Sequence, residues 1–302
     1  MTELIIIKSI TEAHQLLGLE KPKHPLVSVF HHSDEKMRHD YGDIRCALDL
    51  YHVALKEGMT GSMGYGRNSY DFQEGTMMFS GPGQVLTPPE GEHPQDPKGW
   101  TLLFHPDLIR KSELGKTIDD YSFFSYDVHE ALHLSDDEKI SLSELVAKIE
   151  KEINQNIDRH SQKLIVSNIE LLLDYCTRYY DRQFYTRTNL NKDIVTKFEH
   201  LLKDYYHSDK PFEMGIPTVH YCGRELCKSP NYLSDLLKKE TGRNAQEHIH
   251  YYLIDRAKTK LLSSTDPISR IAYDLGFEYP QHFSTLFKSK TGKSPAEYRN
   301  LN

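Results

Sequence analysis

Hydrophobic and polar positions alternate with two different spacings along this chain. Between Pro25 and about His105, short apolar runs alternate with glycine and proline, which is typical of short antiparallel strands in a sandwich or barrel. From Ser135 onward, apolar residues recur every three or four positions, which predicts amphipathic helices. The pattern therefore predicts a β-rich N-terminal part followed by helices, with strands at 26–30, 44–55, 76–79, 84–87 and 100–104.

Two helices are predicted between residues 135 and 180. Ser135 and Glu138 have the spacing of a capping box at the start of the first helix, and residues 158–161 interrupt the pattern before the second. The apolar stripes of these helices either cover the strands or meet their counterparts in a second subunit, and the stripes alone favour packing within one chain. Residues 180–191 lack a clear period, so we interpret them as the connection between two domains, with a boundary near residue 188.

A helical unit is written twice in the C-terminal part, at a spacing of fifty residues. Pro230–Gly242 aligns with Pro280–Gly292, with Pro, Ser, Leu, Lys, Thr and Gly recurring in register. A shorter helical pattern precedes each copy, at 219–226 and at 268–275, and a short turn joins the two patterns. This order is typical of a helix-turn-helix.

Local signals mark the ends of the repeated helices. Ser229 and Asp266 each precede a proline and are predicted N-caps, because proline at the first helical position loses no hydrogen bond. Gly242 and Gly292 are predicted left-handed C-caps.

The repeated motifs also need close packing and a spacer. Gly223 and Ala272 are small at the point where a following helix would cross. Residues 246–262 predict a helix of roughly 25 Å that joins the two motifs. A further helix over 194–206 would pack on the first motif.

With these motifs, residues 216–299 resemble the double helix-turn-helix DNA-binding domain of the AraC/XylS family of bacterial transcription regulators. The second motif carries the resemblance through Ile268–Phe277 and Phe287–Pro295, followed by Tyr298 and Arg299. The resemblance implies binding to double-stranded promoter DNA, with RNA polymerase as a further partner. It also implies a homodimer formed through the region of the helices at 135–180.

The charge of the chain becomes informative only when it is divided. All 302 residues carry 37 Lys and Arg against 44 Asp and Glu, a formal net charge of −7, which by itself argues against a nucleic-acid partner. Residues 1–190 hold 20 basic and 30 acidic side chains, whereas residues 191–302 hold 17 and 14. An acidic body joined to a mildly basic domain fits a sensor attached to a DNA reader.

Cysteine content and hydropathy restrict the compartment. No pair among Cys46, Cys176, Cys222 and Cys227 has Cys-x-x-Cys spacing, so reduced, structural thiols are expected. The apolar run Leu4–Ile7 is too short for a signal peptide, and no segment reaches the length of a membrane span. We expect a cytoplasmic protein without a membrane partner.

The strand-rich region resembles the cupin barrel that many members of this family carry as a sensor, most clearly at Glu74–Gly83. Metal-binding cupins bring His and Glu ligands together on neighbouring strands. Here His31 and His32 are adjacent and should point to opposite faces, His52 stands alone, and Val85 lies near the place of the later ligand. No metal or other cofactor is therefore expected.

A barrel without metal can still bind a small-molecule effector. Its candidate pocket residues, each of which is otherwise a core or rim side chain, are His52, Tyr65, Tyr70, Trp100 and His105.

The predicted architecture is therefore α+β with two domains. Residues 1–188 form a cupin-like antiparallel barrel at about 25–105 and a helical hairpin at about 135–180, for effector sensing and dimerisation. Residues 189–302 form an all-α domain with two helix-turn-helix motifs joined by a linker helix.

The candidate DNA contacts are the exposed positions of the second helix of each motif, which enters the major groove. Asn231 and Gln281 could pair with base edges, His282 would approach the backbone, and Lys238 would meet phosphate. Asp235 would accept from a cytosine amino group or form a local salt bridge. The full set is Asn231, Tyr232, Ser234, Asp235, Lys238, Gln281, His282, Ser284, Thr285 and Lys288.

Three functions stay open. The first is a sequence-specific regulator controlled by an effector in the barrel. The second is a constitutive regulator whose barrel only dimerises. The third, a cupin enzyme with a DNA-binding appendage, lacks a metal constellation, so no catalytic residue is proposed.

Overall fold

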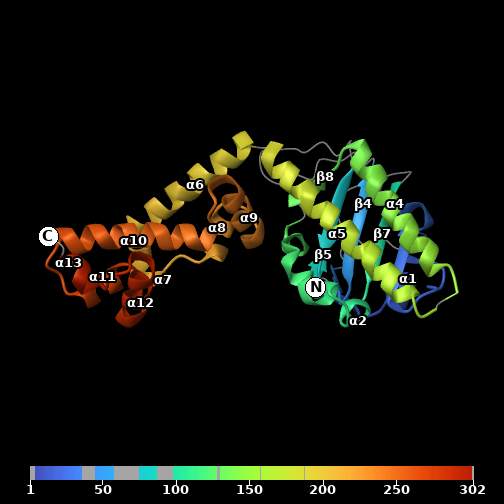
Figure 1. The fold of residues 1–302 in the computed structure, drawn as a ribbon, viewed down its shortest axis with the longest axis horizontal. Helices are drawn as coiled ribbons and strands as arrows, with labels where there is room; N and C mark the ends of the chain where they lie inside the picture. The colour runs from blue at the N-terminus through green and yellow to red at the C-terminus, as the bar shows by residue number, and fades with distance from the viewer. Residues whose placement is uncertain are drawn as a thin grey trace. The chain divides into compact units, whose positions relative to one another are not determined.

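A computed structural model describes residues 4–35, 45–57, 75–86, 98–127, 130–156, 158–186 and 188–300. The chain divides into two compact units, Met1–Gln183 and Phe184–Asn302. The first unit is mixed α/β and the second is helical (Figure 1).

Two sheets build the described part of the N-terminal unit. One has the strand order β1–β3–β6 and the other the order β2–β7–β4–β5–β8. The strands are β1 Leu4–Ile7, β2 Val27–His31, β3 Arg45–Leu48, β4 Tyr51–Glu57, β5 Thr76–Ser80, β6 Gln84–Leu86, β7 Lys98–Phe104 and β8 Leu132–His133.

The predicted strands occur, with two corrections. The single strand expected at 44–55 is two strands, β3 and β4, which belong to different sheets. β1 was not expected, and it pairs with β3 in parallel, so the strand pairing is not wholly antiparallel. A four-residue apolar run is too short for its period to distinguish a strand from other structures, so only its pairing partner identifies it.

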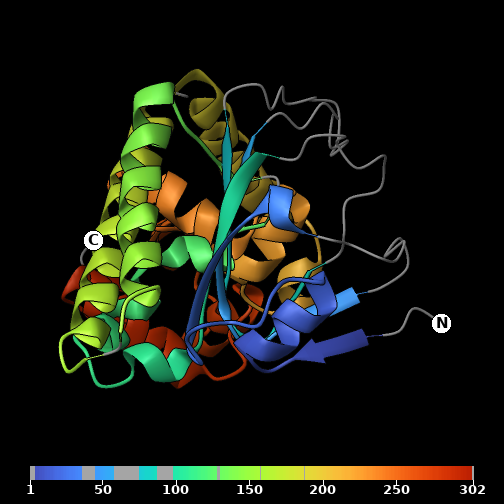
Figure 2. The same cartoon turned by 90° about the vertical axis from the view of Figure 1, so that its right-hand side faces the viewer.

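Helices lie on both faces of the five-stranded sheet (Figure 2). The long helices α4 and α5 pack on one face, where Trp100 Nε1 donates to Ser143 Oγ and the Phe79 and Tyr180 rings meet. On the other face, His14 Nε2 of α1 lies 2.7 Å from Ser28 Oγ. The helices are α1 Ile10–Leu17, α2 Pro106–Ile109, α3 Leu114–Thr117, α4 Asp136–Ile153 and α5 Ser161–Thr186, with 3-10 turns η1 His32–Asp34, η2 Ile118–Asp120 and η3 Ser122–Ser125.

The capping box predicted at the start of α4 is confirmed. Ser135 Oγ accepts from the Glu138 backbone N–H, and Glu138 Oε2 accepts from the Ser135 N–H at 2.9 Å. Two of the backbone donors left unpaired at a helix start are thereby satisfied.

One hydrophobic core unites the helices of the C-terminal unit. Phe198 of α6, Leu253 of α10 and Phe283 of α12 are fully buried in it. The linker helix α10 lies between the helix pairs α8–α9 and α11–α12 (Figure 1). The helices are α6 Thr188–Tyr206, α7 Lys210–Met214, α8 Val219–Glu225, α9 Pro230–Thr241, α10 Ala245–Ser263, α11 Ile268–Asp274, α12 Pro280–Thr291 and α13 Pro295–Arg299.

The expectation of an irregular connection at 180–191 is wrong. α5 continues to Thr186, and α6 begins at Thr188. Tyr180, Gln183 and Phe184 are buried at helical spacing, so side chains that read as irregular in the sequence belong to a packed helix face.

The predicted helix ends are confirmed with one exception. Ser229 caps α9 by accepting from the Tyr232 N–H, and Gly242 and Gly292 end α9 and α12 in the left-handed conformation. Asp266 is not an N-cap, because α11 begins at Ile268 and Pro267 occupies the capping position.

Candidate nucleic-acid interface and ligand pocket

Helix α9 presents a polar face formed by four of the five candidate residues in the first copy. Asn231 and Lys238 are exposed, and Ser234 and Asp235 are half-buried. The opposite face carries Leu233, Leu236 and Leu237, which are fully buried. The helix is therefore held by its apolar stripe, and its polar side chains remain available to a partner.

Tyr232 is the exception and corrects the prediction. Its side chain is only 5% exposed. The ring lies 5.2 Å from that of Phe184, and Lys228 Nζ lies 5.4 Å from its centroid. Tyr232 therefore anchors α9 to the preceding helices, and its position beside Asn231 in the sequence gave no warning of this burial.

Helix α12 presents the corresponding face of the second copy. Gln281, His282, Thr285 and Lys288 are exposed, and Ser284 is half-buried. The hydroxyls of Ser284 and Thr285 donate to the carbonyls four residues earlier, at 3.1 and 2.9 Å. These two side chains can therefore offer a partner an acceptor oxygen more readily than a donor.

Tyr279 is a candidate that the sequence prediction missed. It precedes α12, is 46% exposed, and its ring lies 5.4 Å from that of His282. A large aromatic side chain left in solvent at the N-terminal end of α12 was the available signal.

The turn of each helix pair makes a close backbone approach. A Cβ on Gly223 would lie 2.6 Å from the Lys228 carbonyl oxygen, so glycine is required where the α8–α9 turn folds back. A Cβ on Gly276 would lie 2.6 Å from the Gly215 carbonyl carbon, and Gly276 has a φ of 90°. The first contact requires glycine in the α8–α9 turn, and the second requires glycine where the end of α11 approaches the segment after α7.

The N-terminal unit contains a second candidate site on the sheet face that α1 partly covers. In the register, His52 of β4 lies opposite Ser80 of β5 and Leu103 of β7. Lys56 lies opposite Thr76 and therefore shares that face, because side chains alternate along a strand. On the same face, Phe30 and Leu103 pack against α1.

Three buried polar atoms on this face have unused hydrogen-bonding capacity. His52 Nδ1, Thr76 Oγ1 and Ser80 Oγ are buried and have no hydrogen-bond partner among the described residues. Unpaired buried polar atoms cost free energy, and a native fold normally satisfies them with protein, water or ligand. His32 on the same side is satisfied, since its Nε2 lies 2.9 Å from Thr101 Oγ1.

Burial controls the charges around these atoms. It lowers the pKa of His52 to about 3, with Lys56 and His32 contributing in the same direction. Burial also lowers the pKa of His32 and of Lys56, and nearby Glu35 opposes the shift for Lys56. At neutral pH the His52 ring is therefore uncharged and can offer one donor and one acceptor nitrogen.

The predicted pocket residues separate in the structure. His52 lies on the polar face. Trp100 lies on the opposite face, where its Nε1 donates to Ser143 Oγ of α4, so the structure does not bring it together with His52. His105 follows β7 and caps α2 through Nδ1, which accepts from the Asp107 N–H. Tyr65 and Tyr70 lie outside the described residues.

Sequence reasoning missed Lys56, Thr76 and Ser80. The signal was present as polar residues four positions apart within short strands, at 52 and 56 and at 76 and 80. Such spacing places both members of each pair on one sheet face. Which strands become neighbours, however, is decided only by the fold.

Neither metal ligation nor a membrane span is found within the described residues. The prediction that His31 and His32 diverge is confirmed, since His31 lies 3.8 Å from Glu150 on α4 and His32 is bonded to Thr101. The described segments contain no group of three potential metal ligands. No helix in these segments is long and apolar enough to cross a membrane.

One family model matches part of the C-terminal unit. A family described as a helix-turn-helix domain matches residues 222–301. The uncharacterized transcriptional regulatory protein YesN of Bacillus subtilis is 34% identical over 111 residues, which cover 35% of this chain and 28% of that protein. The arabinose operon regulatory protein of Escherichia coli is 33% identical over 92 residues, which cover 30% of each protein. The matches thus span less than a third of these relatives.

The solved structures that match cover either about a third or most of this chain. The C-terminal domain of the two-component response regulator yesN from Fusobacterium nucleatum is 25% identical, and the match covers 36% of this chain and 99% of that one at a TM-score of 0.32. ToxT from Vibrio cholerae is 17% identical, and the match covers 83% of this chain and 88% of that one at a TM-score of 0.29.

Proposed function

We propose that this protein is a sequence-specific, DNA-binding transcription regulator of the AraC/XylS family, because a helix-turn-helix family matches residues 222–301 and the second motif carries the resemblance to that family. The relatives it matches are named as transcriptional regulators. The observation that carries the proposal is the pair of helices α9 and α12, each anchored by a buried stripe and each exposing polar residues at its N-terminal end.

Both helix pairs act as helix-turn-helix motifs in this proposal. α9 and α12 enter successive major grooves about 34 Å apart, on one side of the duplex. Asn231 and Gln281 read base edges, Lys238 and Lys288 bind phosphate, and His282 approaches the backbone. Because Tyr232 is buried, the proposed DNA contacts of α9 are Asn231, Ser234, Asp235 and Lys238. Those of α12 are Gln281, His282, Ser284, Thr285 and Lys288.

The test is selection of bound duplexes from a random pool by the purified full-length protein. We expect an enriched site with two separate conserved blocks about one turn of the duplex apart. A single conserved block would remove one of the two motifs from the proposal. Binding without any enriched sequence would contradict sequence-specific regulation altogether.

The N-terminal unit is the effector sensor in this proposal, with a cupin-like arrangement of its two sheets. The support is three unpaired buried polar atoms on one sheet face. His52 lies opposite Ser80, and Thr76 lies four residues along β5 on the same face, which also carries apolar side chains that pack against α1. Ligand pockets combine an apolar lining with a few polar groups in this way. The complementary ligand carries hydroxyl or carboxylate oxygens at one end and an apolar body at the other.

A homodimer completes the proposal. Leu164 and Leu171 of α5 are 47% and 44% exposed, and a spacing of seven places them on one helix face. An unpartnered apolar stripe on a helix fits self-association, and a dimer would read two copies of the DNA site. Regulators of bacterial promoters act in the cytoplasm, where RNA polymerase would be the further partner.

A constitutive regulator, with an N-terminal unit that only dimerises, is the alternative. It predicts that His52, Thr76 and Ser80 are satisfied by water rather than by a ligand.

A further inference from the structure

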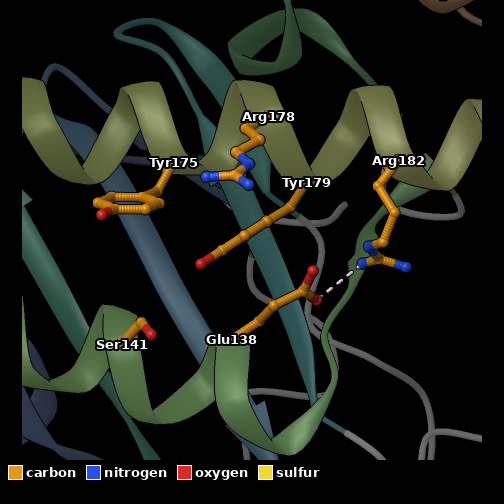
Figure 3. Close-up of a pocket in the computed structure, with 6 residues that line it drawn as sticks. All are labelled: Glu138, Ser141, Tyr175, Arg178, Tyr179 and Arg182. Carbon is orange, nitrogen blue, oxygen red and sulfur yellow. Dashed lines mark hydrogen bonds and ion pairs between the residues drawn. The ribbon is translucent and has the colours of Figure 1, made fainter.

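A cleft lies between α4 and α5, on the opposite side of the five-stranded sheet from His52. Its volume is about 450 Å³, within the general range of ligand pockets, roughly 300–1,000 Å³. Four residues from the last turns of α5 and two from the start of α4 line it: Glu138, Ser141, Tyr175, Arg178, Tyr179 and Arg182 (Figure 3).

Positive charge in this cleft exceeds negative charge. The Glu138 carboxylate is already committed, since its Oε2 accepts from Arg182 Nη2 and from the Ser135 backbone N–H, both at 2.9 Å. Arg178 has no hydrogen bond or ion pair among the described residues. Two guanidinium groups thus face one neutralised carboxylate, which leaves the Arg178 charge uncompensated.

Arg182 adds a preorganised donor. Its Nη2 also donates to the His133 carbonyl at 2.7 Å, which fixes the guanidinium on the wall of the cleft. Its Nε is buried and has no hydrogen-bond partner among the described residues. A guanidinium with one edge fixed and one N–H unused is suited to carboxylate or phosphate oxygens.

Aromatic and hydroxyl groups complete the lining. The Tyr175 and Tyr179 rings are 5.9 Å apart. Figure 3 shows both tyrosines extending from α5 towards α4, with the Arg178 guanidinium above the Tyr179 ring and Ser141 on the facing helix. The cleft therefore offers cationic, hydroxyl and ring surfaces to a single small molecule.

We propose that this cleft binds a small organic anion, a carboxylate or a phosphate monoester, through Arg178 and Arg182. This site is separate from the candidate pocket at His52 and does not depend on DNA binding. Four of its residues lie on the last turns of α5, and α5 continues to Thr186, past Phe184, where the C-terminal unit begins.

The test is isothermal titration calorimetry of the full-length protein with benzoate and with inorganic phosphate, at constant ionic strength. We expect saturable binding of at least one probe. Arg178→Ala should weaken it about tenfold or more, since charge-assisted hydrogen bonds to an anion are the strong ones. Because Arg178 has no partner in the described chain, the variant should keep its melting temperature without ligand.

Arg159→Ala is the matched control. It removes an exposed arginine near the start of α5, at the far end of the helix from the cleft, and should leave probe binding unchanged. Tyr175→Phe should keep most of the affinity if the ring is the main contact and lose it if the hydroxyl is. No saturable heat with either probe, or equal binding by native protein and Arg178→Ala, would overturn the proposal. A change in oligomeric state without a change in probe affinity would overturn it as well, and would assign the cleft to a second copy of the chain.

Discussion

At the scale of single residues, the recognition helices divide into anchors and readers. Tyr232 is buried between Phe184 and Lys228, whereas Asn231 next to it is exposed. Adjacent residues of a helix can therefore have different roles, because successive helical side chains point about 100° apart.

Alanine substitutions should distinguish base readers from phosphate contacts. Asn231→Ala and Gln281→Ala should each cost about 1–3 kcal/mol of binding and relax specificity in a different block of the site. Lys288→Ala should weaken all sequences equally and reduce the salt dependence. Competition binding with single-base variants of the selected duplex measures both effects, and a uniform loss from all three substitutions would reject the assignment.

His52 should make the N-terminal unit sensitive to acid. The unfolded chain takes up a proton at this residue below about pH 6.5, whereas burial lowers the pKa of native His52 to about 3. The unfolded state then binds more protons, so stability is lost as the pH falls from 7 to 5, by roughly 2 kcal/mol.

The chain's one tryptophan makes this measurable. Trp100 lies in the N-terminal unit, so denaturant unfolding followed by its fluorescence reports on that unit. His52→Gln should show a smaller loss between pH 7 and pH 5 than the native protein. An identical loss in both would mean that other groups, such as His32, carry the pH dependence.

At the scale of elements, the packing of the helices in the C-terminal unit depends on close backbone contacts. Gly276 follows α11 and crosses Gly215, which follows α7, with both residues at positive φ. A side chain at 276 would meet both backbone strain and a steric clash.

The glycines offer a matched comparison. Gly276→Ala should lower the melting temperature of the C-terminal unit more than Gly292→Ala does, because both have positive φ but nothing lies within 4 Å of a Cβ at 292. Backbone strain alone costs about 1–2 kcal/mol. Calorimetry should show the difference while the Trp100 transition stays unchanged, and equal effects would place the cost in φ alone.

At the scale of the whole molecule, self-association and effector binding are the properties to test. Leu164→Glu combined with Leu171→Glu should convert a dimer into a monomer in analytical ultracentrifugation, since burying the added charges would cost far more than the apolar contact gains. Leu262→Glu, at a similarly exposed leucine of α10, is the control. A monomeric native protein at micromolar concentration would contradict the homodimer.

A metabolite screen addresses the effector. A ligand that binds only the folded N-terminal unit must raise the free energy of unfolding of that unit, by about 2.7 kcal/mol at a ligand concentration of one hundred times the dissociation constant. The melting temperature of the unit rises accordingly. Ser80→Ala should reduce the shift if the unpaired hydroxyl binds the ligand. The absence of a shift with diverse sugars, fatty acids and aromatic acids would favour the constitutive regulator.

Local signals in the sequence determined several helix ends. Ser135, Ser229, Gly242 and Gly292 act within one or two turns of the chain, so their roles follow from neighbours in the sequence. The doubled unit at 230 and 280 also repeats as matching helices, α9 and α12.

Contacts between distant segments were decided only by the tertiary structure. The strand pairing that brings His52 beside Ser80 and sends Trp100 to the opposite face depends on which strands become neighbours. The same holds for the parallel β1–β3 pair and for the burial of Tyr232 against Phe184. Capping and periodicity are short-range properties of the backbone, whereas a pocket consists of side chains whose proximity arises only when the core packs.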